Sequence, residues 1–154
     1  MCHLPPYLVI HLSRCEYDLK ENFLSDSLYL QHKITTNVVY PLEDLDMAPY
    51  LLEEMREKGV SYLYDLIGVA CHRGSGMEGH YSAICRDNVD GVNKWFRYSD
   101  DTVEEVSVKV VRSADAYALV YSRKGAATHS AIDIVQYLHN NLCVCYKEIM
   151  KNVV

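Results

Sequence analysis

The chain has 154 residues, 49% of them hydrophobic, and a formal net charge of −6. This length suits one domain with a modest core, and the acidic charge with scattered lysines and arginines offers no basic stripe for nucleic acid. No apolar run reaches the roughly 18 residues that span a bilayer, so we expect no membrane partner and an intracellular location, cytoplasmic or nuclear.

The six cysteines are expected to be free thiols, because they lie within apolar runs of a chain that has a core. The sequence contains no Cys-x-x-Cys pair, which is the spacing typical of structural zinc sites. We therefore expect neither a bound metal nor a cofactor.

The first part of the chain predicts strands separated by acidic loops. Residues 7–12 (YLVIHL) follow two prolines and are typical of a buried strand. Residues 33–40 (KITTNVVY) predict another strand that ends before a proline. Residues 42–59 then predict a loop that leads into a short helix closed by Gly59.

The middle of the chain predicts an antiparallel pair of strands. Residues 62–74 and 79–87 are extended runs joined by a glycine-bearing loop. Residues 88–91 (NVDG) indicate a turn. Further strands are predicted at residues 94–100 and 116–123. The result is a mainly antiparallel sheet.

After residue 124 the pattern becomes helical. Ser130 and Asp133 resemble a capping box, and apolar residues then recur at helical spacing. They are Ile132, Val135, Leu138, Leu142, Cys145, Ile149 and Val153. We expect an amphipathic helix over residues 128–150, and packing on its own sheet is favoured over docking to a partner. The chain thus divides into residues 1–124 and a helical part, 125–154.

His80 follows Gly79 at the start of a predicted strand, where it could be structural, a metal ligand or a general base. Its position alone favours a structural role. However, Ser99 and Asp100 end the strand that the next hairpin folds back beside it. An oxygen acceptor beside an imidazole fixes which ring nitrogen carries the proton, as in the orienting half of a catalytic triad.

Five segments carry a more specific signal. They are LPPYLVIHLSR, YPLEDLDMAPYL, YLYDLIGVACHRGSGMEGHYSAICRD, KWFRYSDDTVEEVS and AYALVYSR, and together they cover about residues 4–123. In order and spacing they resemble the C-terminal half of the catalytic domain of ubiquitin-specific proteases. The resemblance implies an α+β fold of the papain-like cysteine peptidase type, here the mainly antiparallel sheet half plus a C-terminal helix, and ubiquitin or ubiquitinated proteins as partners.

The resemblance also implies roles for individual residues. The histidine of the Gly-His-Tyr motif, here His80, would be the general base of a Cys-His-Asp/Asn triad. The loop from His72 to Gly79 resembles the one that closes over the ubiquitin tail, so His72 and Gly79 are expected to bind substrate. Tyr81 is either a core aromatic or a further tail-binding residue, and strand alternation toward the cleft wall keeps it among the substrate-binding residues.

The third position of the triad departs from the family pattern, because Ser99 stands where Asp or Asn is usual. Either Ser99 or Asp100 could orient His80; we favour Ser99, with Asp100 polarising the site or the oxyanion region. Regular strand alternation would turn Asp100 to the opposite face from Ser99, unless the strand bulges.

The family's Cys box has no counterpart in this sequence. We therefore expect a cysteine peptidase that cuts the bond after the C-terminal glycine of ubiquitin, represented by the half that carries the base and inactive alone. Its nucleophile would lie in a missing N-terminal half, upstream or on another chain. The alternative is a catalytically inactive module that binds ubiquitin or acts as a scaffold.

Overall fold

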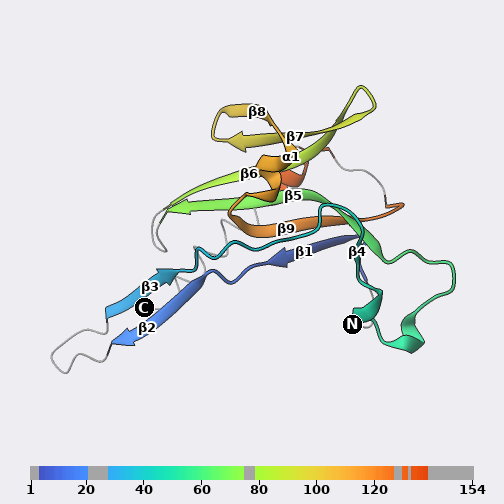
Figure 1. The fold of residues 1–154 in the computed structure, drawn as a ribbon, viewed down its shortest axis with the longest axis horizontal. Helices are drawn as coiled ribbons and strands as arrows, with labels where there is room; N and C mark the ends of the chain where they lie inside the picture. The colour runs from blue at the N-terminus through green and yellow to red at the C-terminus, as the bar shows by residue number, and fades with distance from the viewer. Residues whose placement is uncertain (1–3, 21–27, 75–78, 127–129, 132, 139–154) are drawn as a thin grey trace.

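The structure is a computed structural model that describes residues 4–20, 28–74, 79–126, 130, 131 and 133–138. Within these residues the chain forms a seven-stranded antiparallel sheet (Figure 1). Its strands lie in the order β1 (Tyr7–His11), β9 (Ala116–Arg123), β5 (Leu63–Gly74), β6 (Gly79–Val89), β7 (Val92–Ser99) and β8 (Thr102–Val106), and β4 (Leu45–Asp46) pairs with β5. β2 (Cys15–Lys20) and β3 (Leu28–Lys33) form a separate ribbon that projects from the sheet.

The strands predicted at residues 7–12, 62–74, 79–87, 94–100 and 116–123 are confirmed as β1, β5, β6, β7 and β9. They pair in the antiparallel sense throughout. The predicted turn is also confirmed.

That turn consists of two residues between β6 and β7, Asp90 and Gly91. Their φ angles are +53° and +80°. Aspartate and glycine tolerate this left-handed backbone, whose twist matches that of the flanking strands.

The prediction of a strand over residues 33–40 is wrong, because β3 ends at Lys33 and the chain then leaves the ribbon. Arg14 gives the physical reason. Its Nη1 donates hydrogen bonds to the carbonyl oxygens of Ile34 and Thr36, at 3.0 and 2.9 Å. These carbonyl groups are satisfied by a side chain instead of a neighbouring strand.

The helix predicted within residues 42–59 is also wrong as a single element. The structure has two short 3₁₀ turns there, η1 (Ala48–Tyr50) and η2 (Glu53–Met55). Pro49 lies in the first of them, where its fixed φ is tolerated. Gly59 lies beyond the second in a turn, with a φ of +82°.

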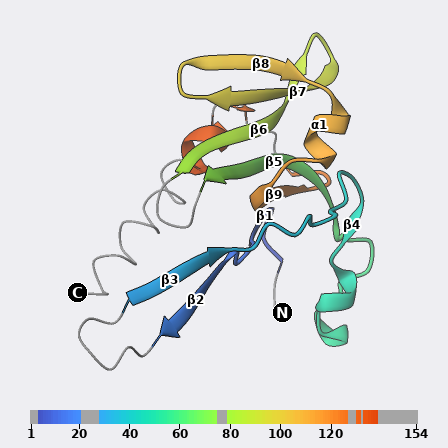
Figure 2. The same cartoon turned by 60° about the vertical axis from the view of Figure 1, so that its left-hand side comes forward.

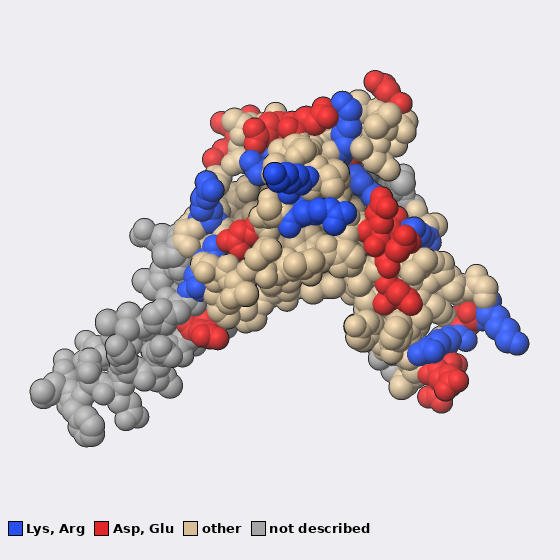
Figure 3. All heavy atoms as spheres, in the orientation of Figure 1, with Lys and Arg blue, Asp and Glu red and all other residues tan. Residues whose placement is uncertain are grey.

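β8 and the short helix α1 (Val108–Arg112) were not predicted. β8 is held beside β7 by ion pairs at 2.9 Å, Arg97 with Glu104 and Lys94 with Glu105. Figure 3 shows acidic side chains along β8 above basic ones. The acidic sequence of β8 is typical of a loop, and only this pairing makes it a strand.

The sheet packs on both faces because successive strand residues point to opposite sides. One face carries large side chains, which include Tyr64, Leu66, Ile84 and Tyr121, in an apolar cluster with the segments at residues 40–51 and with α1. The other face, called here the small-residue face, carries the smaller side chains of Ala70, Ala83, Cys85, Ala118 and Val120.

The small-residue face is covered by the C-terminal helical segment, defined as residues 131 and 133–138. Figure 2 shows it beside β5 and β6. The predicted capping box is confirmed, since Asp133 N donates to Ser130 Oγ at 3.3 Å and Ser130 N donates to Asp133 Oδ2 at 3.2 Å. The rest of the predicted helix lies outside the described residues. No helix in the described part of the chain is long and apolar enough to cross a membrane.

Candidate functional site

His80 lies at the start of β6, where this strand pairs with the end of β5. In this register Arg73 is opposite His80, and Gly74 is opposite Gly79. The His80 side chain is 49% exposed. The ring therefore lies at the protein surface, at this end of β5 and β6, and not in the packed interior.

The end of β7 brings a hydroxyl group to this ring. His80 Nε2 lies 2.7 Å from Ser99 Oγ. Ser99 is itself held in the β7–β8 hairpin, where it pairs with Thr102 and its carbonyl accepts a hydrogen bond from Thr102 Oγ1 at 2.7 Å. When Ser99 Oγ accepts the hydrogen bond from His80, Nε2 carries the proton and Nδ1 carries a lone pair. Nδ1 has no hydrogen-bond partner among the described residues.

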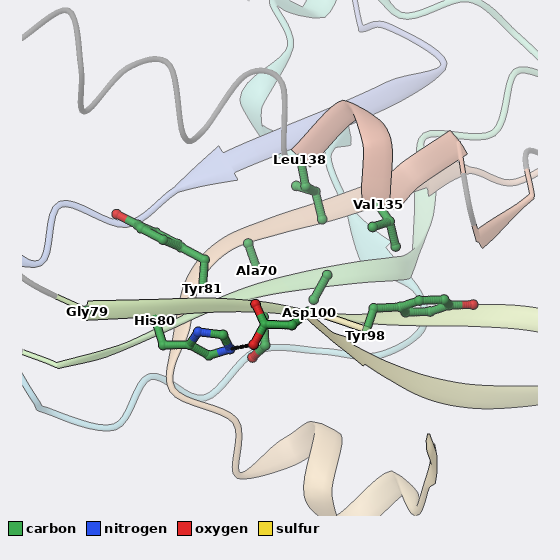
Figure 4. Close-up of a pocket in the computed structure, with 10 residues that line it drawn as sticks. Ala70, Gly79, His80, Tyr81, Tyr98, Asp100, Val135 and Leu138 are labelled. Atoms are coloured by element: carbon green, nitrogen blue, oxygen red, sulfur yellow. Dashed lines mark ion pairs between the residues drawn. The ribbon is translucent and has the colours of Figure 1, made fainter. Parts of the chain in front are cut away.

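Asp100 also reaches the imidazole, with Oδ2 at 3.5 Å from His80 Nε2 (Figure 4). The expectation from regular alternation is wrong here, because β7 ends at Ser99 and Asp100 adopts a left-handed backbone, with a φ of +47°. Aspartate tolerates this conformation. The Asp100 side chain is 78% exposed, so water and salt screen its charge.

A pocket of about 370 Å³ opens beside His80. Its walls come from β5, β6, β7 and the C-terminal helical segment, as Figure 4 shows. Gly79, Tyr81 and Asp100 line it together with His80. Further lining residues, which sequence reasoning did not assign to the site, are Ala70, Ser82, Ala83, Tyr98, Val135 and Leu138. For the last two the only signal was their place on the apolar side of the predicted helix.

His72, Gly79 and Tyr81 are brought together at the same strand end. His72 is buried, and its ring centroid lies 4.5 Å from that of Tyr81. A Cβ at position 79 would overlap the His72 imidazole, so only glycine fits there. Burial, with a smaller contribution from the charge of Lys33, lowers the pKa of His72, which favours its neutral form.

A partly buried ionic network fixes the end of β5 that carries His72. Lys33 Nζ donates to the His72 carbonyl and lies 3.0 Å from Asp115 Oδ2. Arg14 Nη1 lies 3.5 Å from Asp115 Oδ1, and Arg14 Nε donates to the carbonyl of Ala116. Sequence reasoning missed this network, because its members are far apart in the chain.

The cysteines whose side chains the structure describes, Cys71 and Cys85, do not supply a nucleophile. Cys71 and Cys85 are free thiols, as predicted, and burial raises the pKa of Cys71 to about 11 and that of Cys85 to about 12. A thiol with such a pKa carries almost no thiolate near neutral pH. In the described part of the chain, no three His, Cys, Asp or Glu side chains converge on a site that could hold a metal ion.

Solved structures of the SAGA DUB module are similar to this chain. The yeast module with a mutant Sgf73 matches with a TM-score of 0.62 and 30% identity, over 80% of this chain and 24% of that chain. The module of Ubp8, Sgf11, Sus1 and Sgf73 bound to ubiquitin aldehyde matches with a TM-score of 0.62 and 29% identity, over 80% of this chain and 26% of that one. The class is thus confirmed as a mainly antiparallel sheet of the papain-like cysteine peptidase fold.

Sequence comparison identifies the family. The profile of the ubiquitin carboxyl-terminal hydrolases matches residues 1–121. Ubiquitin carboxyl-terminal hydrolase 10 of Arabidopsis thaliana is 37% identical over 127 residues, which are 82% of this chain and 12% of that relative. The chain belongs to the ubiquitin carboxyl-terminal hydrolase family, and it spans about an eighth of the length of this relative.

Proposed function

We propose that this chain is the part of a deubiquitinating cysteine peptidase that carries the general base. The observation that supports this most directly is the bond of 2.7 Å between His80 Nε2 and Ser99 Oγ, which leaves Nδ1 as the basic nitrogen. The nucleophilic thiol comes from a polypeptide outside these 154 residues, so the chain alone is inactive. The activity belongs inside the cell, in the cytoplasm or nucleus, where thiols stay reduced.

His80 transfers protons in both halves of this scheme, the formation of a thioester and its hydrolysis. Nδ1 takes the proton of the incoming thiol, and the thiolate attacks the carbonyl carbon of the terminal glycine of ubiquitin. The imidazolium then gives the proton to the leaving amine as the C–N bond breaks. Water attacks the resulting thioester with Nδ1 again as base, which releases the ubiquitin carboxylate and restores the thiol.

Ser99 and Asp100 support the base in different ways. Ser99 Oγ accepts a hydrogen bond from Nε2–H and holds the ring in one tautomer, so it contributes by orienting the base. Asp100 Oδ2 lies 3.5 Å from Nε2 and is largely exposed, so it places a screened negative charge beside the ring. Gly79 and Tyr81 form the surface on which the glycine-ended tail of ubiquitin binds, and the buried His72 supports it by packing against Tyr81.

The proposal is tested by supplying the thiol. A Cys-box segment of a ubiquitin-specific protease is fused ahead of residue 1, and the hydrolysis of a fluorogenic ubiquitin amide is followed. We expect turnover that His80→Ala lowers by about 10²–10⁴-fold. His11→Ala is the matched control, since His11 is an exposed histidine of β1 that packs on Tyr117. No turnover, or equal loss in both variants, contradicts the proposal.

A second candidate function is a catalytically inactive module that binds ubiquitin or serves as a scaffold. Two observations favour it: a neutral hydroxyl stands at the orienting position, and burial makes Cys71 and Cys85 unreactive. Titration of fluorescently labelled ubiquitin with the chain tests it. Saturable binding that Tyr81→Ala weakens supports this function if the fused enzyme is inactive, and a folded chain that fails to bind excludes it.

A further inference from the structure

His80 lies on an end of β5 and β6 that extends beyond the neighbouring strands. The ladder of β5 with β9 ends at the pair Cys71 and Ala116, and that of β6 with β7 ends at the pair Ala83 and Tyr98. Beyond these points, in the described part of the chain, β5 and β6 pair only with each other, and Figure 1 shows this end projecting past β7 and β9. This two-stranded extension consists of His72, Arg73, Gly74, Gly79, His80 and Tyr81.

A two-stranded element is at best marginally stable without further support, so contacts from outside are needed to fix the extension. On the β7 side the His80 imidazole bonds to Ser99. On the β9 side the ring centroids of His72 and Tyr81 lie 6.2 and 5.9 Å from that of Tyr117. These contacts are made by side chains, and none of them fixes the main chain of the extension.

Lys33, the last residue of β3, provides a contact to this main chain. Its Nζ donates to the carbonyl of His72 and lies 3.0 Å from Asp115 Oδ2. His72 and Asp115 are the residues that would form the next pair of the β5–β9 ladder, and the ammonium bridges them instead. The Lys33 side chain is only 10% exposed, so this charge-assisted contact is screened little by water.

The other end of the bridge is fixed by Arg14, whose side chain is 5% exposed. Its Nη1 lies 3.5 Å from Asp115 Oδ1 and donates to the carbonyl of Ile34, the residue after Lys33, at 3.0 Å. Its Nε donates to the carbonyl of Ala116, the first residue of β9. Lys33 therefore holds the extension to a part of the structure that is itself held in place.

A displacement of His72 would pass directly to the residues that line the pocket. Its imidazole packs on Gly79, where a Cβ would overlap it, and its ring centroid lies 4.5 Å from that of Tyr81. Gly79 and Tyr81 flank His80 in the sequence and line the same pocket. The positions of the base and of the tail-binding surface therefore depend on where the main chain of His72 is held.

We infer that Lys33 is a positioning residue of the site: its ammonium fixes the two-stranded extension through the His72 carbonyl, and binding of the glycine-ended tail of ubiquitin depends on this contact. This inference rests on the function proposed above. It gives Lys33 no contact with the reacting atoms, because the residue acts through the main chain of His72.

The first test measures whether Lys33 fixes the extension in the full chain. Lys33→Met removes the ammonium, and Lys94→Met is the matched control, because Lys94 also pairs with a carboxylate, Glu105, at 2.9 Å. Hydrogen–deuterium exchange is followed by mass spectrometry in peptides that cover residues 79–82 and 86–89. We expect exchange at 79–82 to be about tenfold faster in Lys33→Met and unchanged in Lys94→Met, and exchange at 86–89 to stay native in Lys33→Met. Native exchange at 79–82 in Lys33→Met overturns the inference.

Binding of the tail separates positioning from a general effect on stability. The chain and its variants are titrated with labelled ubiquitin and with ubiquitin that lacks its glycine-ended tail, and the ratio of the two Kd values reports the contribution of the tail. A loss of stability lowers the folded fraction for both ligands equally and leaves this ratio unchanged. We expect Lys33→Met to lower the ratio by about threefold or more and Lys94→Met to leave it unchanged.

Asp115→Asn is a milder second variant, because it removes the charge beside Lys33 and keeps an acceptor. It replaces Lys33→Met if the near-ultraviolet circular dichroism of that variant shows loss of the packed fold. We expect changes in the same direction and of smaller size in both measurements. Native exchange at residues 79–82 together with a native ratio of Kd values in Asp115→Asn then overturns the inference.

The two measurements also separate this inference from the proposed function. A native chain whose Kd is the same with and without the tail refutes the tail-binding surface, and faster exchange in Lys33→Met then retains Lys33 as the anchor of the extension. If the tail strengthens binding to the native chain and the ratio is unchanged in Lys33→Met, the positioning role is overturned while the proposed function stands.

Discussion

Gly79→Ala is the substitution for which the structure makes its most quantitative steric prediction. The added Cβ would lie 2.7 Å from the carbonyl oxygen of Arg73 and overlap the imidazole of His72. The imidazole can rotate, but the carbonyl belongs to the β5–β6 ladder and moves only with the strand. Overpacking of this kind costs about 1–3 kcal/mol of unfolding free energy. At about 2–4 °C per kcal/mol for a chain of this size, the Tm should fall by about 2–12 °C.

Urea denaturation of a double-mutant cycle measures both parts of this cost. The variants are Gly79→Ala, His72→Ala and the pair, each compared with the native chain. We expect His72→Ala to recover only part of the loss caused by Gly79→Ala, because the contact with the Arg73 carbonyl remains. A cost below about 0.5 kcal/mol for Gly79→Ala, or a complete recovery in the pair, would refute the steric reasoning.

Four further predictions concern thiols, pH, the orienting hydroxyl and the C-terminal part. Burial raises the pKa of Cys71 to about 11 and that of Cys85 to about 12, so both thiols should react with iodoacetamide at pH 8 far more slowly than free cysteine. Labelling at the rate of free cysteine would contradict this prediction. Burial lowers the pKa of His72 below 6.5, so the unfolded chain binds more protons than the folded chain as the pH falls. The free energy of unfolding should therefore fall between pH 7 and pH 5 more steeply in the native chain than in His72→Gln. Equal slopes in urea titrations would count against this prediction. In the fused enzyme Ser99→Ala should lower turnover by about 2–10-fold, which corresponds to the free energy of one neutral hydrogen bond. Ser99→Asp should raise turnover. An alanine variant with native turnover would exclude Ser99 as the orienting group. Removal of residues 125–154 uncovers the small-residue face and should lower the soluble fraction after centrifugation, whereas unchanged solubility would show that this cover is dispensable.

The fold was predictable where strand residues report their own environment. β1, β5 and β9 are rich in β-branched, aliphatic and aromatic residues and were recognised from these alone. β8 was missed because its two adjacent glutamates suit a loop until the basic residues of β7 pair with them. The extended segment after Lys33 was misjudged because its carbonyl groups bind Arg14, which lies 20 and 22 residues earlier in the chain. Such contacts between distant residues leave no local pattern.

The site was predictable in its residues but not in its geometry. The resemblance to the family singled out His80, Ser99 and Asp100, and the structure brings them together. Alternation along a strand placed Asp100 on the wrong face, because it cannot foresee a left-handed residue directly after the last ladder pair. The wall formed by Val135 and Leu138 depends on where a helix docks, and amphipathic spacing shows only that it docks somewhere.

The position of β8 at one edge of the large sheet has a consequence for self-association. An edge strand offers unpaired main-chain groups to which a strand of another molecule can add. Glu104 and Glu105 are consecutive, so their carboxylates stand on both faces of this edge, each tied to a basic partner on β7. An added strand would bring its side chains against these charges. The barrier to fibril growth at this edge is therefore electrostatic, and it should weaken at 1 M salt, where the screening length is only about 3 Å.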